Sequence, residues 1–178
     1  MLGSAVSAPL RMPRPEAMRA TIRPFEVGDA GSLIALVLGI QRNEFGIPIS
    51  LEDQPDLQDV PGYFREGRGG FWVAATGSAI VGCVGLVDLG SDDGALRKMF
   101  VHRDHRGGEL AVARRLLAAL LGHARAAGMR RIYLGTTDKF RAAHRFYEKN
   151  GFSLVPESEL PANFSRMALD TRFYAIDL

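Results

Sequence analysis

The spacing of apolar residues along the chain predicts four helices. In each, apolar side chains recur every three or four positions and so line one face of a helix. Asp29 is a candidate cap for the first helix, while Gly128 and Gly151 end the third and fourth. Pro61 and Gly62 would interrupt the second helix unless they fall in its first turn. The four predicted helices span 28–45, 55–67, 109–127 and 139–150.

Runs of apolar and β-branched residues predict seven strands between and after these helices. Gly77 and Ser78 join the second and third strands as a hairpin. The order of strands and helices indicates one mixed α/β sheet with helices packed on its faces. The predicted strands span 19–26, 71–77, 79–89, 95–101, 130–136, 152–155 and 167–178.

The composition is that of one globular domain. The 178 residues are 47% hydrophobic and 24% charged, which is typical of a single domain with its own core. Residues 1–17 lack periodicity and predict a flexible tail, which leaves 18–178 as the domain. No apolar run reaches the ~18 residues needed to cross a bilayer, and the N-terminus lacks the apolar core of a secretory signal. We therefore expect a cytoplasmic protein with no membrane partner.

Charge is distributed unevenly along the chain. The net charge is +2, yet the segment from Arg97 to Lys149 holds 13 Lys and Arg against 4 Asp and Glu. A strongly basic segment suits a polyanionic ligand, a nucleic acid or a solvated helix face. The charge alone does not decide among these three.

The loop before the third helix has the chemistry of an anion site. The first backbone N–H groups of a helix have no partner within it and attract anions. Gly107 and Gly108 allow a tight turn, and the small Ala111 and Ala113 let a ligand approach the backbone. Arg106 and neighbouring arginines add positive charge. Neither of the usual nucleotide-binding glycine motifs occurs in the chain. The loop is therefore compatible with pyrophosphate binding outside those two fold classes.

Two segments make this chain resemble the GNAT superfamily of acyl-CoA-dependent N-acetyltransferases. Residues 101–117 resemble its pyrophosphate-binding motif, and the stretch "RFYEKNGF", 145–152, resembles the end of its last helix. The resemblance implies a mostly antiparallel seven-stranded sheet with a splayed parallel pair at its centre and helices on both faces. It also implies acetyl-CoA as cosubstrate, with the pantetheine paired to the fourth strand and the pyrophosphate held by loop amides. The residues implied for cofactor binding are Met99, Phe100, Val101, Arg106, Gly107, Gly108, Glu109, Ala111, Val112, Ala113 and Arg114.

The chain departs from the family pattern at two positions. If the family motif is aligned from Arg106, Glu109 stands where the motif has glycine. If it is aligned on the helix instead, Ala111 and Ala113 occupy the positions where the motif has small residues, and the loop before the helix becomes longer. Phe140 stands where the family usually has asparagine. The first departure shifts which amides would bind the cofactor, and the second removes a polar cofactor contact.

Amide formation from a thioester needs a neutral amine, stabilisation of an oxyanion and protonation of the leaving thiolate. The resemblance implies an oxyanion donor among the backbone N–H groups of Met99, Phe100 and Val101, where the family has a bulge. A regular strand without a bulge at these three residues is the alternative that stays open. Tyr147 resembles the family's general acid, and a phenol with a pKa of about 10 can protonate a thiolate.

The pattern leaves the general base open. The candidates are Glu44 after the first helix, Asp88 near the end of a strand expected to face the same region, and His102 beside the loop. His123 and His144 are expected on helix surfaces. A metal is not expected, because the histidines at 102 and 105 lack a third ligand and the single cysteine, at 83, has no partner at ligand spacing.

Acidic residues gather around the predicted second helix and favour a small cationic amine as acceptor. A solvated acidic surface explains them equally well, and a peptide N-terminus, a protein lysine and an antibiotic amine all stay open. The acidic residues are Glu44, Glu52, Asp53, Asp56 and Asp59.

Two functions from other classes stay open as well. A non-catalytic acyl-CoA-binding sensor or subunit is compatible with Phe140 and the irregular loop. A nucleic-acid binder would need exposed aromatic residues among the basic ones, whereas Phe146, Tyr147 and Phe152 are expected to pack, so we expect no nucleic-acid partner. A homodimer through the C-terminal strand is compatible with the sequence.

Overall fold

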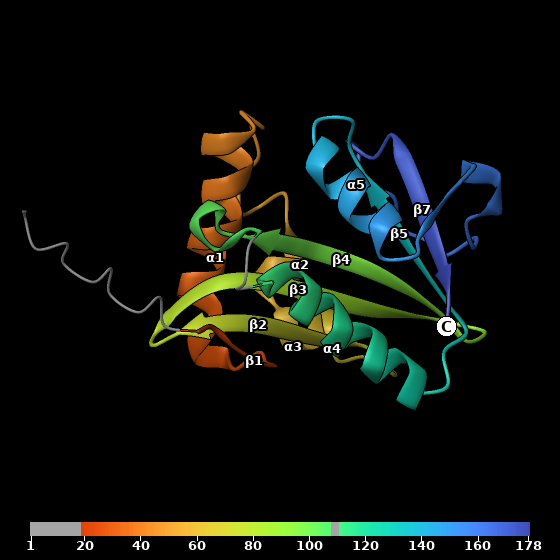
Figure 1. Cartoon of the computed structure of the whole chain (residues 1–178), viewed down its shortest axis with the longest axis horizontal. Helices are drawn as coiled ribbons and strands as arrows, with labels where there is room; N and C mark the ends of the chain where they lie inside the picture. The colour runs from red at the N-terminus through yellow and green to blue at the C-terminus, as the bar shows by residue number, and fades with distance from the viewer. Residues whose placement is uncertain (1–18, 108–110) are drawn as a thin grey trace, which may run out of the picture.

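The computed structural model describes residues 19–107 and 111–178. Within them, seven strands form one sheet in the order β1-β2-β3-β4-β5-β7-β6 (Figure 1). β4 and β5 are parallel, and the other neighbouring pairs are antiparallel, which confirms the expected fold with a central parallel pair. The predicted tail, residues 1–17, lies outside the described residues. The strands are β1 (Thr21–Pro24), β2 (Gly70–Thr76), β3 (Ala79–Gly90), β4 (Asp93–Val101), β5 (Arg131–Thr136), β6 (Ser153–Val155) and β7 (Arg172–Asp177).

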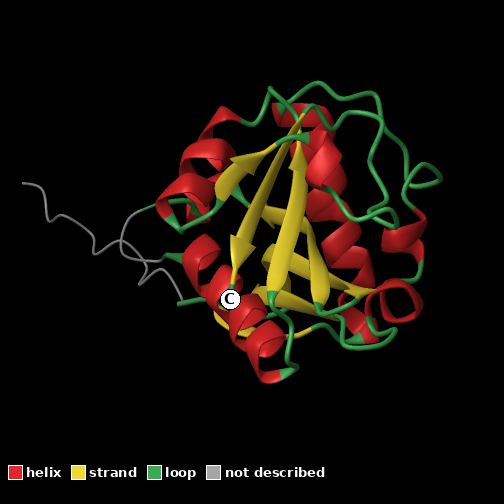
Figure 2. Ribbon diagram, turned by 90° about the vertical axis from the view of Figure 1, so that its right-hand side faces the viewer, coloured by secondary structure: helices red, strands yellow, loops and turns green. Residues whose placement is uncertain are grey.

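Helices cover both faces of the sheet (Figures 1 and 2). The apolar sides of α4 and α5 pack on one face, and α1, α2 and α3 pack on the other. The helices are α1 (Ala30–Gly39), α2 (Pro55–Gln58), α3 (Val60–Phe64), α4 (Val112–Ala126) and α5 (Arg141–Lys149). A π-helical turn, η2 (Ile40–Glu44), continues α1, and three 3-10 turns are η1 (Val27–Asp29), η3 (Arg103–His105) and η4 (Glu157–Glu159).

Strand alternation gives the sheet an apolar surface on each side. Along β3, Val84 and Leu86 pack in the core under α4, whereas Cys83 packs in the core under α1 to α3. A smaller cluster around Phe164 and Phe173 lies beside β5 and β7. Each fully buried aliphatic or aromatic side chain contributes roughly 1.5–3 kcal/mol of transfer free energy. These cores hold the strands that position the site.

The helix predicted from Pro55 to Gly67 is two short helices, so that prediction is wrong. Asp59 lies between them with φ −135° and ψ 75°, and its carboxylate accepts the backbone N–H of Gly62 at 2.9 Å. This contact caps α3. Pro61 falls in the first turn of α3, where its missing N–H is not needed.

Two predicted boundaries are also corrected. α4 begins at Val112 rather than at 109, because Ala111 has a left-handed backbone (φ 44°, ψ 32°) that no α-helical residue adopts. β7 begins at Arg172, so 167–171 do not belong to the strand. Among the helices of the described residues, none is both long enough and apolar enough to cross a membrane.

Candidate active site

The two central strands diverge towards one end of the sheet. β4 pairs with β5 from Asp93 to Ala95. β4 then continues to Val101 and β5 to Thr136, with no further pairing between them in the described residues. Figure 1 shows this splay between β4 and β5. The edge of β4 that lines it has no strand partner, so its backbone groups can hydrogen-bond an extended ligand.

A β-bulge lies on the splayed part of β4. Cys83 of β3 pairs with Phe100, but Gly85 pairs with Arg97, so β4 has one more residue than β3 between the two pairs. Lys98, inside the bulge, has a left-handed backbone with φ 52°. A bulge leaves backbone groups outside the ladder. The bulge expected beside the oxyanion donors is therefore present, and Lys98 is its strained residue.

α4 begins directly after the loop that follows β4. Gly107 in this loop has φ 70°, and Ala111 precedes the first helical residue. No side chain of the described residues caps α4, and within the described residues the N–H groups of Val112 and Ala113 have no hydrogen-bond partner, the state that attracts an anion. The predicted cofactor residues at 108 and 109 lie outside the described residues.

Arg106 is bound within the protein. Its Nε donates to the carbonyl oxygen of Val101 at 2.6 Å, and its two terminal nitrogens donate to the carboxylate of Glu44 at 2.8 and 3.1 Å. These contacts tie the end of β4 to the end of η2. Glu44 balances the charge of Arg106, and the predicted contact of Arg106 with the cofactor stays a prediction. Arg114 is exposed on the first turn of α4.

The predicted acid, Tyr147, is packed in the core. It is 5% exposed, and its ring lies 5.5 to 6.2 Å, centroid to centroid, from the rings of Phe146, Phe152 and Tyr174. Burial raises the pKa of the Tyr147 phenol, because the charged form loses hydration. The phenol therefore stays protonated at neutral pH and is available as a donor. Its catalytic role stays a prediction.

Phe140 connects the two sides of the splay. It lies just before α5, and its ring centroid is 4.5 Å from that of Phe45 and 6.4 Å from that of Phe100. Both contacts are edge-on, a favourable arrangement for aromatic rings. Where the family usually has a polar side chain, this chain has an apolar contact between the β5–α5 loop, the residue after η2 and β4.

Asp88 lies towards the opposite end of the β3–β4 pair from the bulge. It pairs across the sheet with Gly94, and its carboxylate accepts from Nε and Nη2 of Arg68 at 3.0 and 3.1 Å. The guanidinium of Arg68 lowers the pKa of Asp88 to about 2. The prediction that Asp88 faces the acceptor region is wrong. A carboxylate so strongly paired is also a weak proton acceptor at neutral pH.

The other two base candidates lie beside the loop between β4 and α4. Glu44 accepts both bonds from Arg106. His102 is partly exposed, and its Nδ1 accepts the backbone N–H of Asp104 at 3.4 Å. Neither arrangement tests a proton-accepting role, so both residues stay predictions.

His144 is buried, which corrects the prediction of a surface position. It is 8% exposed, and its Nε2 lies 3.0 Å from the carbonyl oxygen of Thr137. It shares the inner face of α5 with Tyr147, three residues on, so a polar residue occupies an apolar helix face. His123 is exposed as predicted, with its Nε2 2.9 Å from the carbonyl oxygen of Arg68.

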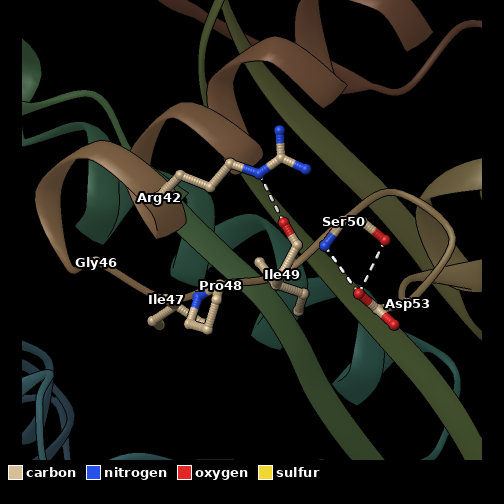
Figure 3. Close-up of a pocket in the computed structure, with 7 residues that line it drawn as sticks. All are labelled: Arg42, Gly46, Ile47, Pro48, Ile49, Ser50 and Asp53. Carbon is tan, nitrogen blue, oxygen red and sulfur yellow. Dashed lines mark hydrogen bonds between the residues drawn. The ribbon is translucent and has the colours of Figure 1, made fainter.

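The acidic residues near α2 are mostly engaged within the protein. Asp53 accepts the backbone N–H and the hydroxyl of Ser50 at 2.9 and 2.8 Å (Figure 3). Asp59 caps α3, and Asp56 pairs with Lys98 at 3.3 Å. With Glu44 held by arginine, four of the five predicted residues have internal partners. Only Glu44 and Asp56 are paired with a cation, whereas Asp53 and Asp59 bond to neutral groups and keep their charge at the surface, so the cationic acceptor stays a prediction.

A pocket of about 490 Å³ lies between η2 and α2. Arg42 borders it, and its Nε donates to the carbonyl oxygen of Ile49 at 2.6 Å. Figure 3 shows the terminal nitrogens of Arg42 turned away from Asp53. An exposed guanidinium therefore lies at the rim of the pocket. The lining residues are Arg42, Gly46, Ile47, Pro48, Ile49, Ser50 and Asp53.

Sequence reasoning missed a buried polar cluster beside the bulge. Lys98 is 9% exposed, Asp56 4%, Gln41 6% and Gln54 0%. The signal that could have revealed it is the charged residue at 98, which interrupts the apolar run of a central strand. Polar residues this buried need partners, and the partners lie in η2 and around α2.

The model of the Acetyltransferase (GNAT) family matches residues 35–152. The chain belongs to this family. A solved GNAT-family acetyltransferase from Staphylococcus aureus Mu50 is 36% identical with a TM-score of 0.85, and the alignment covers 89% of this chain and 99% of that one. The two structures are alike over nearly the whole of both chains. The splay and its bulge therefore belong to a GNAT domain.

Two further comparisons concern named activities. N-acetylaspartate synthetase of Danio rerio is 35% identical over 129 residues, 68% of this chain and 44% of the relative. The GNAT chain thus spans less than half the length of that relative. N-acetylglutamate synthase of Neisseria gonorrhoeae, solved with coenzyme A and N-acetylglutamate, is 20% identical with a TM-score of 0.67, covering 89% of this chain and 35% of that one. At that identity the likeness shows the fold alone.

Proposed function

We propose that this GNAT protein transfers the acetyl group of acetyl-CoA to the primary amine of a small acceptor, by direct attack in a ternary complex. The observation that carries the proposal is the splay between β4 and β5, with the bulge on its β4 side and the uncapped N-terminus of α4 following β4. An extended arm ending in a diphosphate needs a free strand edge and unpartnered N–H groups. The described residues offer both, so they fit acetyl-CoA.

The residues proposed to hold acetyl-CoA belong to two elements. Along β4, the backbone of Met99, Phe100 and Val101 would pair with the pantetheine arm. At the start of α4, the N–H groups of Val112 and Ala113 would meet the pyrophosphate, with the exposed charge of Arg114 beside them. When bound, acetyl-CoA supplies an activated acyl group on a good leaving thiolate.

Two of the three chemical requirements have proposed groups. A backbone N–H at the bulge would donate to the carbonyl oxygen as negative charge develops on it, which is commonly worth 10²–10³ in rate. The neutral phenol of Tyr147 would donate a proton to the leaving sulfur. For the third, Glu44 and His102 stay candidates as acceptors of the amine proton, because both lie beside the loop and can exchange protons with solvent.

For the acceptor, we propose a small amino acid that carries an additional carboxylate. Two of the acidic residues that favoured a cationic amine, Glu44 and Asp56, are paired with Arg106 and Lys98, and the guanidinium of Arg42 lies at the rim of the η2–α2 pocket. The Danio rerio relative is named for N-acetylaspartate, which carries its acetyl group on the amine of an amino dicarboxylate. These observations support aspartate as the first acceptor to test.

Thermal unfolding tests the cosubstrate. At 100 times its Kd, acetyl-CoA should stabilise the native state by about 2.7 kcal/mol, which is roughly 5 to 10 °C for a domain of this size. ATP at equal concentration is the polyanion control and should give a much smaller shift. Equal shifts would indicate unspecific anion binding, and the absence of a shift with acetyl-CoA would contradict the proposal.

Release of coenzyme A, followed with a thiol reagent, tests the acceptor. Aspartate and glutamate should give a kcat/KM at least tenfold above that of spermidine. The reverse order would overturn the acidic acceptor and favour the cationic one. Binding of acetyl-CoA without turnover of any amine would instead favour an acyl-CoA sensor, for which the Phe45–Phe140 contact across the splay would be the structural basis.

A further inference from the structure

Lys98 combines two features that are each unfavourable. Its backbone has φ 52°, a region that residues with a Cβ rarely adopt. Its side chain is also buried, at 9% exposure for the residue, where an ammonium loses most of its hydration. Strained conformations persist only where the surroundings hold them, and they concentrate at functional sites. Folding stability by itself therefore does not account for a lysine at this position.

The side chain of Lys98 is held by partners from another part of the chain. Its Nζ donates to Oε1 of Gln54 at 2.5 Å and lies 3.3 Å from Oδ1 of Asp56. Gln54 is itself fixed by Gln41 through two reciprocal amide hydrogen bonds of 3.0 and 3.1 Å. Burial lowers the pKa of Lys98, and the charge of Asp56 opposes that shift. The ammonium is thus anchored to η2 and to the segment around α2.

The backbone of Lys98 is held as well. Its carbonyl oxygen accepts the thiol of Cys83 on β3 at 3.0 Å. In a regular strand this carbonyl would pair with a backbone N–H, so the thiol bond marks the place where the ladder is interrupted. Three segments, η2, the α2 region and β3, therefore fix this one residue.

The anchor and the bulge depend on each other. Leu96 packs in the core under α4, and in a regular strand residue 98 would face the same side as residue 96. Asp56 precedes Leu57, which packs in the opposite core under α1 to α3. Lys98 can reach Asp56 and Gln54 only because the bulge turns its side chain to that second face. Conversely, satisfying the buried ammonium requires the bulge.

We propose that Lys98 is a positioning residue, whose anchored side chain holds the β4 bulge in the conformation that presents the oxyanion donor of the next residues. The proposal rests on the proposed acetyl transfer. Lys98 itself touches no reacting atom. Its ammonium fixes a backbone turn, and that turn directs an N–H of Met99 or Phe100 into the splay.

Three variants separate positioning from simple stabilisation. Lys98→Met keeps the length of the side chain but leaves Asp56 buried without its cation, so it should lower Tm by roughly 6 to 20 °C. Lys98→Met combined with Asp56→Asn removes both charges and should recover most of that loss. Lys98→Gly also leaves Asp56 without its cation, but glycine adopts φ 52° without strain, so the loss of Tm should be smaller than in Lys98→Met. Lys149→Met, the same change on the exposed end of α5, is the matched control.

The kinetic result then decides between the two roles. Positioning predicts that kcat falls about 10- to 100-fold in all three variants, including the double variant that recovers Tm, since loss of one oxyanion donor costs 10²–10³. KM for acetyl-CoA should change less than threefold. Recovery of kcat together with Tm in the double variant would show a purely structural role and overturn the proposal.

Hydrogen exchange gives a readout that does not depend on activity. In Lys98→Gly, amides of a peptide spanning 97–101 should exchange at least tenfold faster, while a peptide from β2 should be unchanged. Unchanged protection at the bulge would overturn the anchoring role even if the protein turned over no amine tested. Faster exchange in Lys98→Gly, together with a wild-type protein that acetylates no amine tested, would support the anchor and reject only the proposed function.

Discussion

The two ends of β4 differ in what their side chains and backbone do. At the closed end, Gly94 pairs with both neighbouring strands, and a Cβ there would lie 2.8 Å from Ile132 Cδ1 and 2.9 Å from Leu86 Cδ1. At the splayed end the strand lacks one partner, contains a bulge and has a left-handed residue at Lys98. Around Gly94 the strand is close-packed and paired on both sides, whereas at the other end it has one strand partner among the described residues and contains a buried lysine.

The difference separates stability from function within one strand. A fully paired and apolar segment satisfies its backbone within the fold and leaves nothing for a ligand. An unpaired edge leaves donors and acceptors that a ligand can use, but it needs other contacts to keep its shape. The anchor of Lys98 and the Arg106–Glu44 contact supply them from residues far away in the sequence.

The largest expected effect is at the splayed end. Tyr147→Phe should leave acetyl-CoA binding within about threefold and lower kcat by about 10²-fold, because general acid catalysis typically contributes 10²–10⁴. Steady-state kinetics with aspartate as acceptor measures both quantities. An unchanged kcat would remove Tyr147 from the mechanism and would move the proton donor to another group.

Breaking the closed end should affect stability instead. Ile132 is fully buried, and Ile132→Ala should lower the free energy of unfolding by about 2–5 kcal/mol, since it leaves a cavity in the core. The fraction that stays folded should keep its kcat. Urea unfolding together with kinetics normalised to the folded fraction tests this. A fall in normalised kcat above tenfold would show that the two ends are coupled.

The pH dependence of stability should depend on the closed end as well. Arg68 lowers the pKa of Asp88 from 3.8 to about 2, so the pairing is present above pH 4 and is lost as the pH falls through 2. After allowance for solvent screening, the contribution is about 1–2 kcal/mol. Unfolding at pH 5 and pH 2.5 should show that the loss of stability in Asp88→Asn is clearly larger at pH 5, because most of the contribution is gone by pH 2.5. An equal difference at both values would contradict the assignment.

The smallest expected effect is at the loop contact. Glu44→Gln weakens an exposed ion pair with Arg106, and such pairs contribute about 0–1 kcal/mol. We expect an unfolding free energy within that range and a KM for acetyl-CoA raised two- to fourfold, because the loop is held less firmly. A fall in kcat near 10²-fold with KM unchanged would instead identify Glu44 as the general base.

Much of the fold and part of the site were predictable from local patterns. The hairpin at Gly77, the succession of strands and helices, and the GNAT family all followed from residues that are near one another in the chain. The same patterns failed at Asp59, where a capping side chain divides a helix, and at His144, which occupies an apolar helix face. Both errors arose because each side chain has a specific hydrogen-bond partner, and average residue propensities do not account for such partners.

The sequence by itself determined the family, most of the element order and the segments that resemble the family's cofactor motif, because each depends on periodicity or on contiguous residues. Tertiary structure alone decided which charges are engaged. Arg68 and Asp88 are 20 residues apart, Lys98 and Gln54 are 44 apart, and Arg106 and Glu44 are 62 apart. Whether a carboxylate selects a substrate or completes an internal pair depends on such distant partners, and the chain brings them together only when it folds.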